Sequence, residues 1–212
     1  MSFATTRGLA AAVTLAAALA GSAVAIPQAS AATAQCGSLC ASFHPLSYGT
    51  SDVLAVEGAS GTKASQGQKV TIAAASSTNQ AEDWVLEDEG TVSEFYEAGL
   101  MSAEMNLHWG SDQVYQITYA PDGTWTGFCL GVSSTNGSGS VTLQPCGETA
   151  AALWVADTAD ASGRALPLIN GDNNNFSNPY SLTASSPGTQ LTSSQLLGIT
   201  TSQEWGTIYG EL

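Results

Sequence analysis

The stretch FCLGVSSTNGSGSVTLQPCGETAAALW, residues 128–154, contains two short apolar runs followed by a tryptophan. The runs, 129–132 and 141–144, are joined by residues that are all Ser, Thr, Asn or Gly. Short apolar runs separated by turn-forming residues are typical of a β-hairpin. A hairpin brings its two ends together, so we expect Cys129 and Cys146, which bracket the runs, to form a disulfide.

The same pattern occurs twice more in the chain, once before and once after this stretch. Each copy has an apolar run, a Gly-containing turn, a second apolar run and a Trp, and the outer copies are 53–84 and 180–205. The Trp lies 14, 13 and 14 residues after Val70, Val141 and Leu191. It lies 30, 24 and 23 residues after Leu54, Leu130 and Leu182, so the first hairpin has a longer loop. The chain is therefore built on three internal repeats.

The repeats predict an all-β fold that closes around a shared core. A single hairpin with one apolar face cannot bury that face alone, whereas three of them can bury their faces against one another. We expect one strand from each repeat to line the core. Trp84, Trp154 and Trp205 are then core residues rather than ligand-binding residues.

These repeats resemble those of the ricin B-type lectins. Gln203-Glu204-Trp205 is a QxW tripeptide, and residues 128–154 have the leading Cys-Leu, the Val-x-Leu-Gln-x-Cys and the closing Trp in that family's order. The resemblance implies a β-trefoil with pseudo-threefold symmetry. It implies one domain over residues 32–212, with repeats at about 36–90, 113–158 and 165–212.

One insertion, at about 91–112, separates the first two repeats. Leu54 and Leu130 are 76 residues apart, whereas Leu130 and Leu182 are 52 apart. Thr91 and Glu94 form a capping-box pattern before 95–98, with Gly99 as a stop, so we expect one short helix. A strand at 114–119 and a tight turn at 121–123 should follow.

The sugar-binding residues of the resembled family are not matched here. In that family a pocket uses an Asp in the first run, an aromatic residue in the hairpin loop, and an Asn or Gln near the Trp. The Asp position is occupied by Ala55, Gly131 and Thr183, and the three hairpin loops have no aromatic residue. The Gln of QxW occurs only as Gln203, which is as suited to holding its hairpin as to binding a ligand.

A sugar site outside the three usual pockets is the remaining expectation. The segment 91–128 is rich in aromatic residues, and Trp125 follows a tight turn. We therefore expect Trp125 and Trp109 to contact a glycan or a protein, with Asp122, Asp112 or His108 beside them. The alternative is that these aromatic residues pack the insertion against the barrel.

The N-terminus has the features of a secretory signal peptide over residues 1–31. Arg7 precedes a short Ala-rich apolar stretch, and Ala29-Ser30-Ala31 provides a cleavage site, with Ala25 or Ala34 as alternatives. The apolar stretch is shorter than the ~20 residues that a membrane-spanning helix needs. We therefore expect a secreted, extracellular protein, and the Ala-rich leader is typical of bacterial export.

Four cysteines in an exported chain predict disulfides. Four cysteines allow three pairings, and the spacing favours Cys36–Cys40 beside Cys129–Cys146. The spacing of Cys36 and Cys40 would also suit a metal, but zinc normally takes four ligands and the chain has only two histidines. We predict no metal site.

The charge of the chain argues against anionic partners. It has 18 acidic and four basic residues, with a formal net charge of −14. Nucleic acids are bound through Lys and Arg side chains that neutralise phosphates, so they are excluded as partners. An anionic membrane surface is disfavoured for the same reason, and no segment after the leader predicts membrane insertion.

No pattern of residues indicates catalysis or a cofactor. G-x-S-x-G, H-E-x-x-H and Gly-rich phosphate-binding motifs are absent from the sequence. The acidic pairs near Trp84 would suit a glycosidase, but a solvated turn explains them more simply. The segment 172–175 lacks the spaced acidic ligands of a calcium loop. We expect no catalytic residues, no cofactor and no enzyme.

The sequence thus predicts a secreted, non-catalytic, lectin-like module that binds a glycan or polysaccharide. The alternative is a secreted β-trefoil, such as an inhibitor or an envelope-associated factor, that has lost sugar binding and contacts an extracellular protein. The repeats favour the first interpretation, whereas the absence of aromatic residues from the hairpin loops favours the second.

Overall fold

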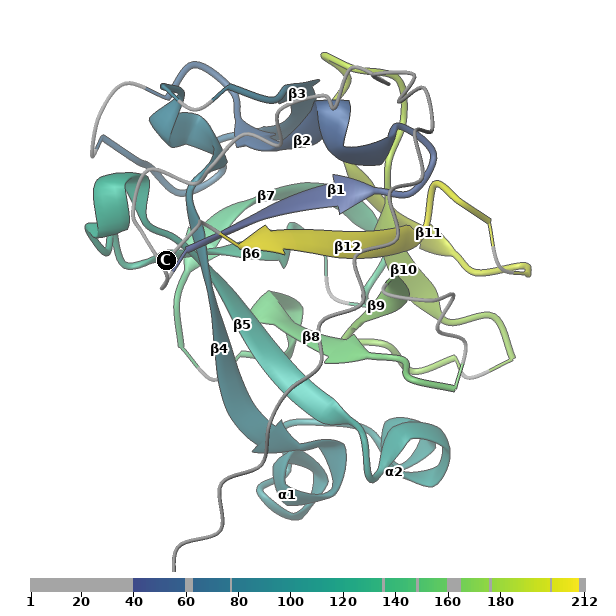
Figure 1. Ribbon diagram of the computed structural model, residues 1–212. Coiled ribbons are helices and arrows are strands. Elements are labelled where there is room, and N and C mark those ends of the chain that lie inside the picture. Colours follow the sequence, from purple (N-terminus) through teal and green to yellow (C-terminus); the bar gives the residue numbers. More distant parts are fainter. Residues whose placement is uncertain are drawn as a thin grey trace, which may run out of the picture.

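The computed structural model describes residues 40–59, 63–76, 78–134, 136–147, 149–159, 165–175, 177–198 and 200–209 (Figure 1). The expected signal peptide and Cys36 lie outside the described residues. The expected repeat boundaries at 36 and 212 lie outside them too.

Six strands, paired antiparallel throughout, form a closed barrel. Neighbouring strands pair in the cyclic order β4–β5–β8–β9–β12–β1, and β1 returns to β4 through Ala41 and Trp84. The strands are β1 (Ala41–Pro45), β4 (Trp84–Thr91), β5 (Gln113–Tyr119), β8 (Leu153–Ala156), β9 (Leu166–Asn170) and β12 (Glu204–Tyr209).

Three hairpins cap one end of this barrel (Figure 1). They bond to one another in a triangle, through the pairs Lys69–Thr142, Ser140–Thr192 and Thr71–Gln190. The hairpins are β2 (Asp52–Val56) with β3 (Val70–Ala74), β6 (Phe128–Val132) with β7 (Gly139–Pro145), and β10 (Tyr180–Thr183) with β11 (Thr192–Gln195). A six-stranded barrel with three capping hairpins is a β-trefoil, the fold that the resemblance to ricin B-type lectins implies.

The three repeat tryptophans join the barrel to the cap in the same way. Trp84, Trp154 and Trp205 begin, or nearly begin, β4, β8 and β12, and all three are buried. Their indole Nε1–H groups donate to the carbonyl oxygens of Leu54, Leu130 and Leu182 over 3.1, 2.9 and 2.8 Å. These acceptors are the leucines whose spacing defined the repeats, so the threefold pattern in the sequence is a repeated buried contact.

The insertion contains two α-helices, α1 (Val92–Glu97) and α2 (Ala103–Trp109). The capping box that begins α1 forms as predicted, because the Thr91 side chain accepts from the Glu94 amide and the Glu94 carboxylate accepts from the Thr91 amide. The second helix was not predicted. Ser102 caps it, Met105 and Trp109 are buried four residues apart on one face, and Met101 just before the cap is buried in the same cluster.

The helices cover one side of the barrel and share a second apolar cluster with it. Phe95, Met105 and Trp109 pack there against Val114 of β5 and Ile169 of β9. Both helices lie at the end of β4 and β5 that is remote from the hairpin cap (Figure 1). Short one-turn helices, η2 (Gly49–Ser51), η3 (Gln80–Glu82), η4 (Pro121–Gly123) and η5 (Ala150–Ala152), connect several of the strands.

Candidate functional site

The three positions that would carry a sugar-binding Asp offer no carboxylate. Ala55 is buried. A Cβ atom on Gly131 would lie 2.8 Å from Cγ of Gln144 and 3.1 Å from the carbonyl oxygen of Ala151. The Thr183 hydroxyl is bonded to the Ser194 hydroxyl and the Gln203 amide. None of the three positions therefore offers a sugar a free carboxylate, and at Gly131 an added side chain would meet Gln144 and Ala151.

Gln203 is a structural residue. Its side chain is 4% exposed, and its Nε2 donates to the Thr183 hydroxyl and to the carbonyl oxygens of Ser194 and Gln195. Its Oε1 accepts from the Thr200 hydroxyl. The amide therefore binds both strands of the β10–β11 hairpin, and its polar atoms are occupied within the protein.

Glu82 occupies the matching position of the first repeat and is held in a comparable way. Its two carboxylate oxygens accept from the backbone amide of Ser76 and the side-chain amide of Asn79. Burial raises the pKa of this carboxyl above its usual range, although these two hydrogen bonds oppose the shift. Ala152 holds the same position in the second repeat and has no side-chain polar atom.

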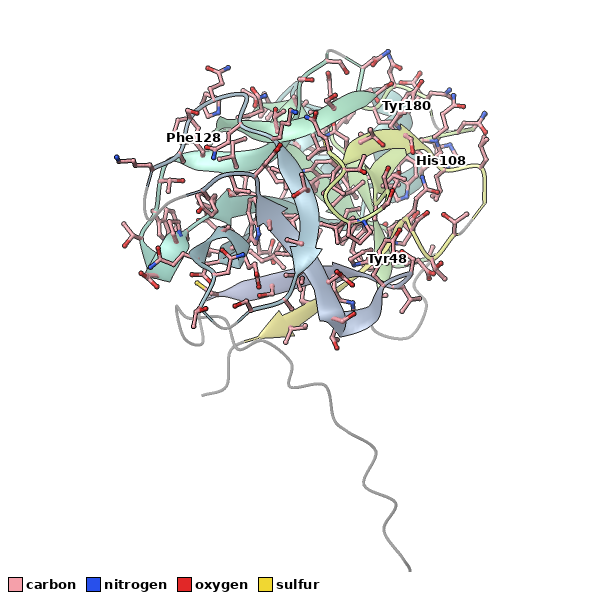
Figure 2. The ribbon with its side chains drawn as sticks, turned by 90° about the horizontal axis from the view of Figure 1, so that it is seen from above. Tyr48, His108, Phe128 and Tyr180 are labelled. Carbon is pink, nitrogen blue, oxygen red and sulfur yellow. A yellow bond between two sulfur atoms is a disulfide. The ribbon has the colours of Figure 1, made fainter. Side chains whose placement is uncertain are left out.

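Trp109 is 7% exposed and forms part of the second apolar cluster, so its ring is not available as a platform for a sugar. The expectation that Trp109 joins Trp125 in contacting a glycan or a protein does not hold for Trp109, because its side chain packs between the insertion and the barrel. His108, labelled in Figure 2, is exposed and its ring lies 5.8 Å from that of Trp109. Asp112 accepts from the Thr158 hydroxyl, and burial raises the pKa of its carboxyl.

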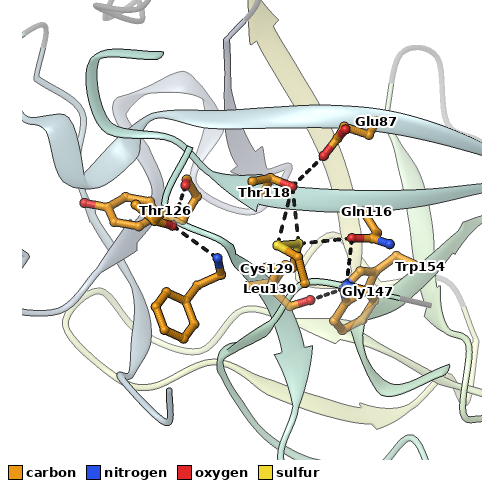
Figure 3. Close-up of a disulfide and its surroundings, with 11 residues drawn as sticks. Glu87, Gln116, Thr118, Thr126, Cys129, Leu130, Gly147 and Trp154 are labelled. Atoms are coloured by element: carbon orange, nitrogen blue, oxygen red, sulfur yellow. Dashed lines mark hydrogen bonds between the residues drawn. A yellow bond between two sulfur atoms is a disulfide. The ribbon is translucent and has the colours of Figure 1, made fainter. Parts of the chain in front are cut away.

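Trp125 is 60% exposed and stands on a loop of seven residues, 121–127, which we call the Trp125 loop. The residues on both sides of the Trp are anchored. Thr124 donates its amide to the Pro121 carbonyl, and Thr126 donates its amide and its hydroxyl to the carbonyl of Tyr119. Figure 3 shows the Thr126 hydroxyl in this arrangement, where it also accepts from the Phe128 amide. An exposed indole is thus held on a backbone that is bonded on either side of it.

Asp122 lies three residues before the indole in the same loop. Its φ of 50° is a left-handed conformation, which Asp tolerates better than most residues. The Asp83 carboxylate accepts from the Asp122 amide over 2.9 Å, and the Asp122 carboxylate accepts from the side-chain amide of Gln80. The loop therefore presents a carboxylate and an aromatic face, and Gln80 of η3 adds an amide that is bonded to this carboxylate.

Gln80 was not found by sequence reasoning. It lies 42 residues before Asp122, on η3, and no spacing in the sequence relates the two. Only the packing of η3 against η4 brings its amide to the Trp125 loop.

The disulfide predicted from the hairpin is present between Cys129 and Cys146, at the base of β6 and β7 (Figure 3). The Thr118 hydroxyl of β5 lies 3.2 Å from Cys129 Sγ and donates to the Glu87 carboxylate of β4. Cys40 is also disulfide-bonded. Its expected partner, Cys36, lies outside the described residues.

Neither a metal centre nor a membrane-spanning helix is found in the described part of the chain. No three His, Cys, Asp or Glu side chains gather there in a way that could hold a metal ion. None of the helices described is long and apolar enough to cross a membrane.

Comparison with known proteins supports the fold. No protein-family model matches the chain, and neither does any curated protein. A designed threefold-symmetric protein, ThreeFoil, is similar in structure, with a TM-score of 0.55 and 16% identity over 82% of this chain and 99% of its own. A mosquitocidal holotoxin is similar with a TM-score of 0.53 and 13% identity over 81% of this chain, which matches 17% of the toxin's length. The chain is thus a β-trefoil with a helical insertion.

Proposed function

We propose that this chain is a secreted, non-catalytic β-trefoil that binds carbohydrate through the Trp125 loop. The observation that carries the proposal is the exposure of Trp125 on an anchored backbone. An indole that is 60% exposed contributes only part of its burial energy to the fold, so packing alone does not explain why a Trp stands at this position. The C–H face of a sugar ring is an apolar surface that can stack on such an indole.

The polar groups beside Trp125 supply the other half of sugar recognition. Asp122 accepts hydrogen bonds from sugar hydroxyls, and Gln80 has both a donor and an acceptor in its side chain. The residues before and after Trp125 are hydrogen-bonded, so the backbone of the loop has little conformational freedom to lose when a ligand binds. A neutral polysaccharide suits the acidic chain better than an anionic one, since the net charge of −14 repels anions.

A glycan array and a pull-down with insoluble polysaccharides test this proposal, with soluble galactose and lactose as competitors. Trp125→Ala should abolish binding, while Trp125→Tyr, which keeps an aromatic face, should retain most of it. Leu107→Ala is the matched control, because Leu107 is also an exposed apolar residue but lies on α2. Binding that survives Trp125→Ala would contradict the assignment of the site.

Asp122→Asn provides a second, milder test. Asn also tolerates the left-handed backbone of this residue, so the loop keeps its shape while the carboxylate is lost. We expect weaker glycan binding with an unchanged unfolding midpoint.

Binding to an extracellular protein is the second candidate, and the insertion favours it. Leu107 is 76% exposed on α2 and Tyr96 is 41% exposed on α1. A shallow hollow beside α1 is lined by Glu94, Phe95, Ala98 and Leu100. Large exposed apolar side chains on neighbouring elements are common at protein interfaces. If no glycan binds, this interpretation takes precedence, and Leu107→Ala becomes the informative variant.

A further inference from the structure

The barrel interior is left unfilled at one end. A cavity of about 170 Å³ is lined by side chains from every barrel strand, among them Phe43, Leu86, Tyr115, Ala156, Leu168 and Thr207. Its wall among the described residues carries no charged side chain. Protein interiors are normally packed as densely as organic crystals, so a space of this size inside a barrel needs an explanation.

The cavity arises where the threefold pattern breaks. The residues two positions after the three repeat tryptophans form one layer, and they are Leu86, Ala156 and Thr207. Only the first repeat supplies a large side chain to this layer. The second and third repeats supply small ones. The space that larger side chains would fill there stays empty, and the cavity lies in it.

The cavity opens away from the hairpin cap. Each tryptophan bonds to a hairpin, so β4, β8 and β12 run from the cap toward the opposite end of the barrel. Phe43 and Ala156 are buried within the cavity, whereas Leu86, Tyr115 and Thr207 are partly exposed at its edge. The deep wall is therefore apolar, and the edge carries two hydroxyl groups.

We propose that this barrel mouth is a binding site for a neutral apolar group of about the size of a benzene ring. An enclosed apolar cavity of about 150 Å³ lined by aliphatic and aromatic side chains binds benzene, and this one has a similar volume but is open at its edge. The neutrality of the ligand follows from the uncharged wall and from the acidic chain. The site shares no residue with the Trp125 loop, so it does not depend on the proposed function.

Benzene is the probe, and calorimetric titration and the unfolding midpoint of the whole protein are the measurements. Ala156→Leu places in the second repeat the residue that the first repeat has. It should raise the unfolding midpoint without ligand, by filling the cavity, and weaken benzene binding at least tenfold. Thr207→Val keeps the volume of the side chain and is the matched control, so its affinity should remain within threefold of that of the unmodified protein.

Two results would overturn the proposal. One is the absence of benzene binding by the unmodified protein up to the solubility limit of benzene. The other is equal binding by Ala156→Leu, which would place the benzene elsewhere. If circular dichroism shows that Ala156→Leu does not fold, Thr207→Leu fills the same layer from β12, and the same two results apply to it.

Discussion

Replacing Trp154 by Phe removes the hydrogen bond that fastens β8 to the second hairpin. The Leu130 carbonyl then loses the donor that lies 2.9 Å away, in a place with no access to solvent. An unsatisfied buried polar group costs about 1–3 kcal/mol. The phenyl ring also lacks two of the buried indole carbons, which at about 0.8 kcal/mol each adds about 1.5 kcal/mol. We therefore expect the free energy of unfolding to fall by about 2.5–4.5 kcal/mol.

Urea denaturation of the oxidised protein, followed by circular dichroism, measures this change. Trp84→Phe should cost a similar amount, because Trp84 is also fully buried and donates to Leu54 over 3.1 Å. Trp125→Phe is the control, and it should change stability by no more than about 0.5 kcal/mol because its ring is exposed. A loss below about 1 kcal/mol for Trp154→Phe, or an equal loss for Trp125→Phe, would refute the reasoning.

Three further predictions follow from single side chains. Gly131→Asp, which restores the acidic residue of the usual sugar pocket, should destabilise the protein by about 1–3 kcal/mol in urea without creating galactose binding, because Gln144 fills the space. Gln203→Ala should lower the free energy of unfolding by about 1–3 kcal/mol, since it removes the amide that joins β10 to β11, while leaving glycan binding unchanged. Tyr119→Phe should be neutral or stabilising, because the buried Tyr119 hydroxyl has no partner among the described residues. Burial and the Asp83 charge raise the pKa of Tyr119 to about 12, so the folded state keeps a proton that the unfolded state loses above its usual pKa of 10.0. The unmodified protein should thus lose stability as pH rises from about 10 to about 12, and thermal melts of Tyr119→Phe should show a smaller loss.

The fold could be predicted from the sequence because one contact, from a Trp indole to a Leu carbonyl, is repeated three times. The distance along the chain from each Leu carbonyl to its Trp is set by a hairpin, and hairpins of similar length leave a similar spacing. The capping box at Thr91 was predictable for a related reason, since its two hydrogen bonds join residues that are three apart.

The candidate site was harder to predict from the sequence, because the burial of a side chain depends on contacts between distant segments. Trp109 and Trp125 are both aromatic residues near the insertion, yet one is buried and the other exposed. The interval of four residues from Met101 to Met105 and on to Trp109 could have revealed α2 and its inward face. No sequence pattern could have placed Gln80 beside Asp122, because that contact exists only through tertiary packing.

The pairing of β1 with β12 has a consequence for how the protein folds. Ala41 pairs with Tyr209, so the barrel closes through a contact between strands at opposite ends of the described chain. Contacts of such long sequence separation form slowly, because the intervening loop must be ordered first. Until β12 pairs with them, β1 and β9 expose unpaired strand edges that invite aggregation. A chaperone that shields strand edges should therefore matter most before this last strand has paired.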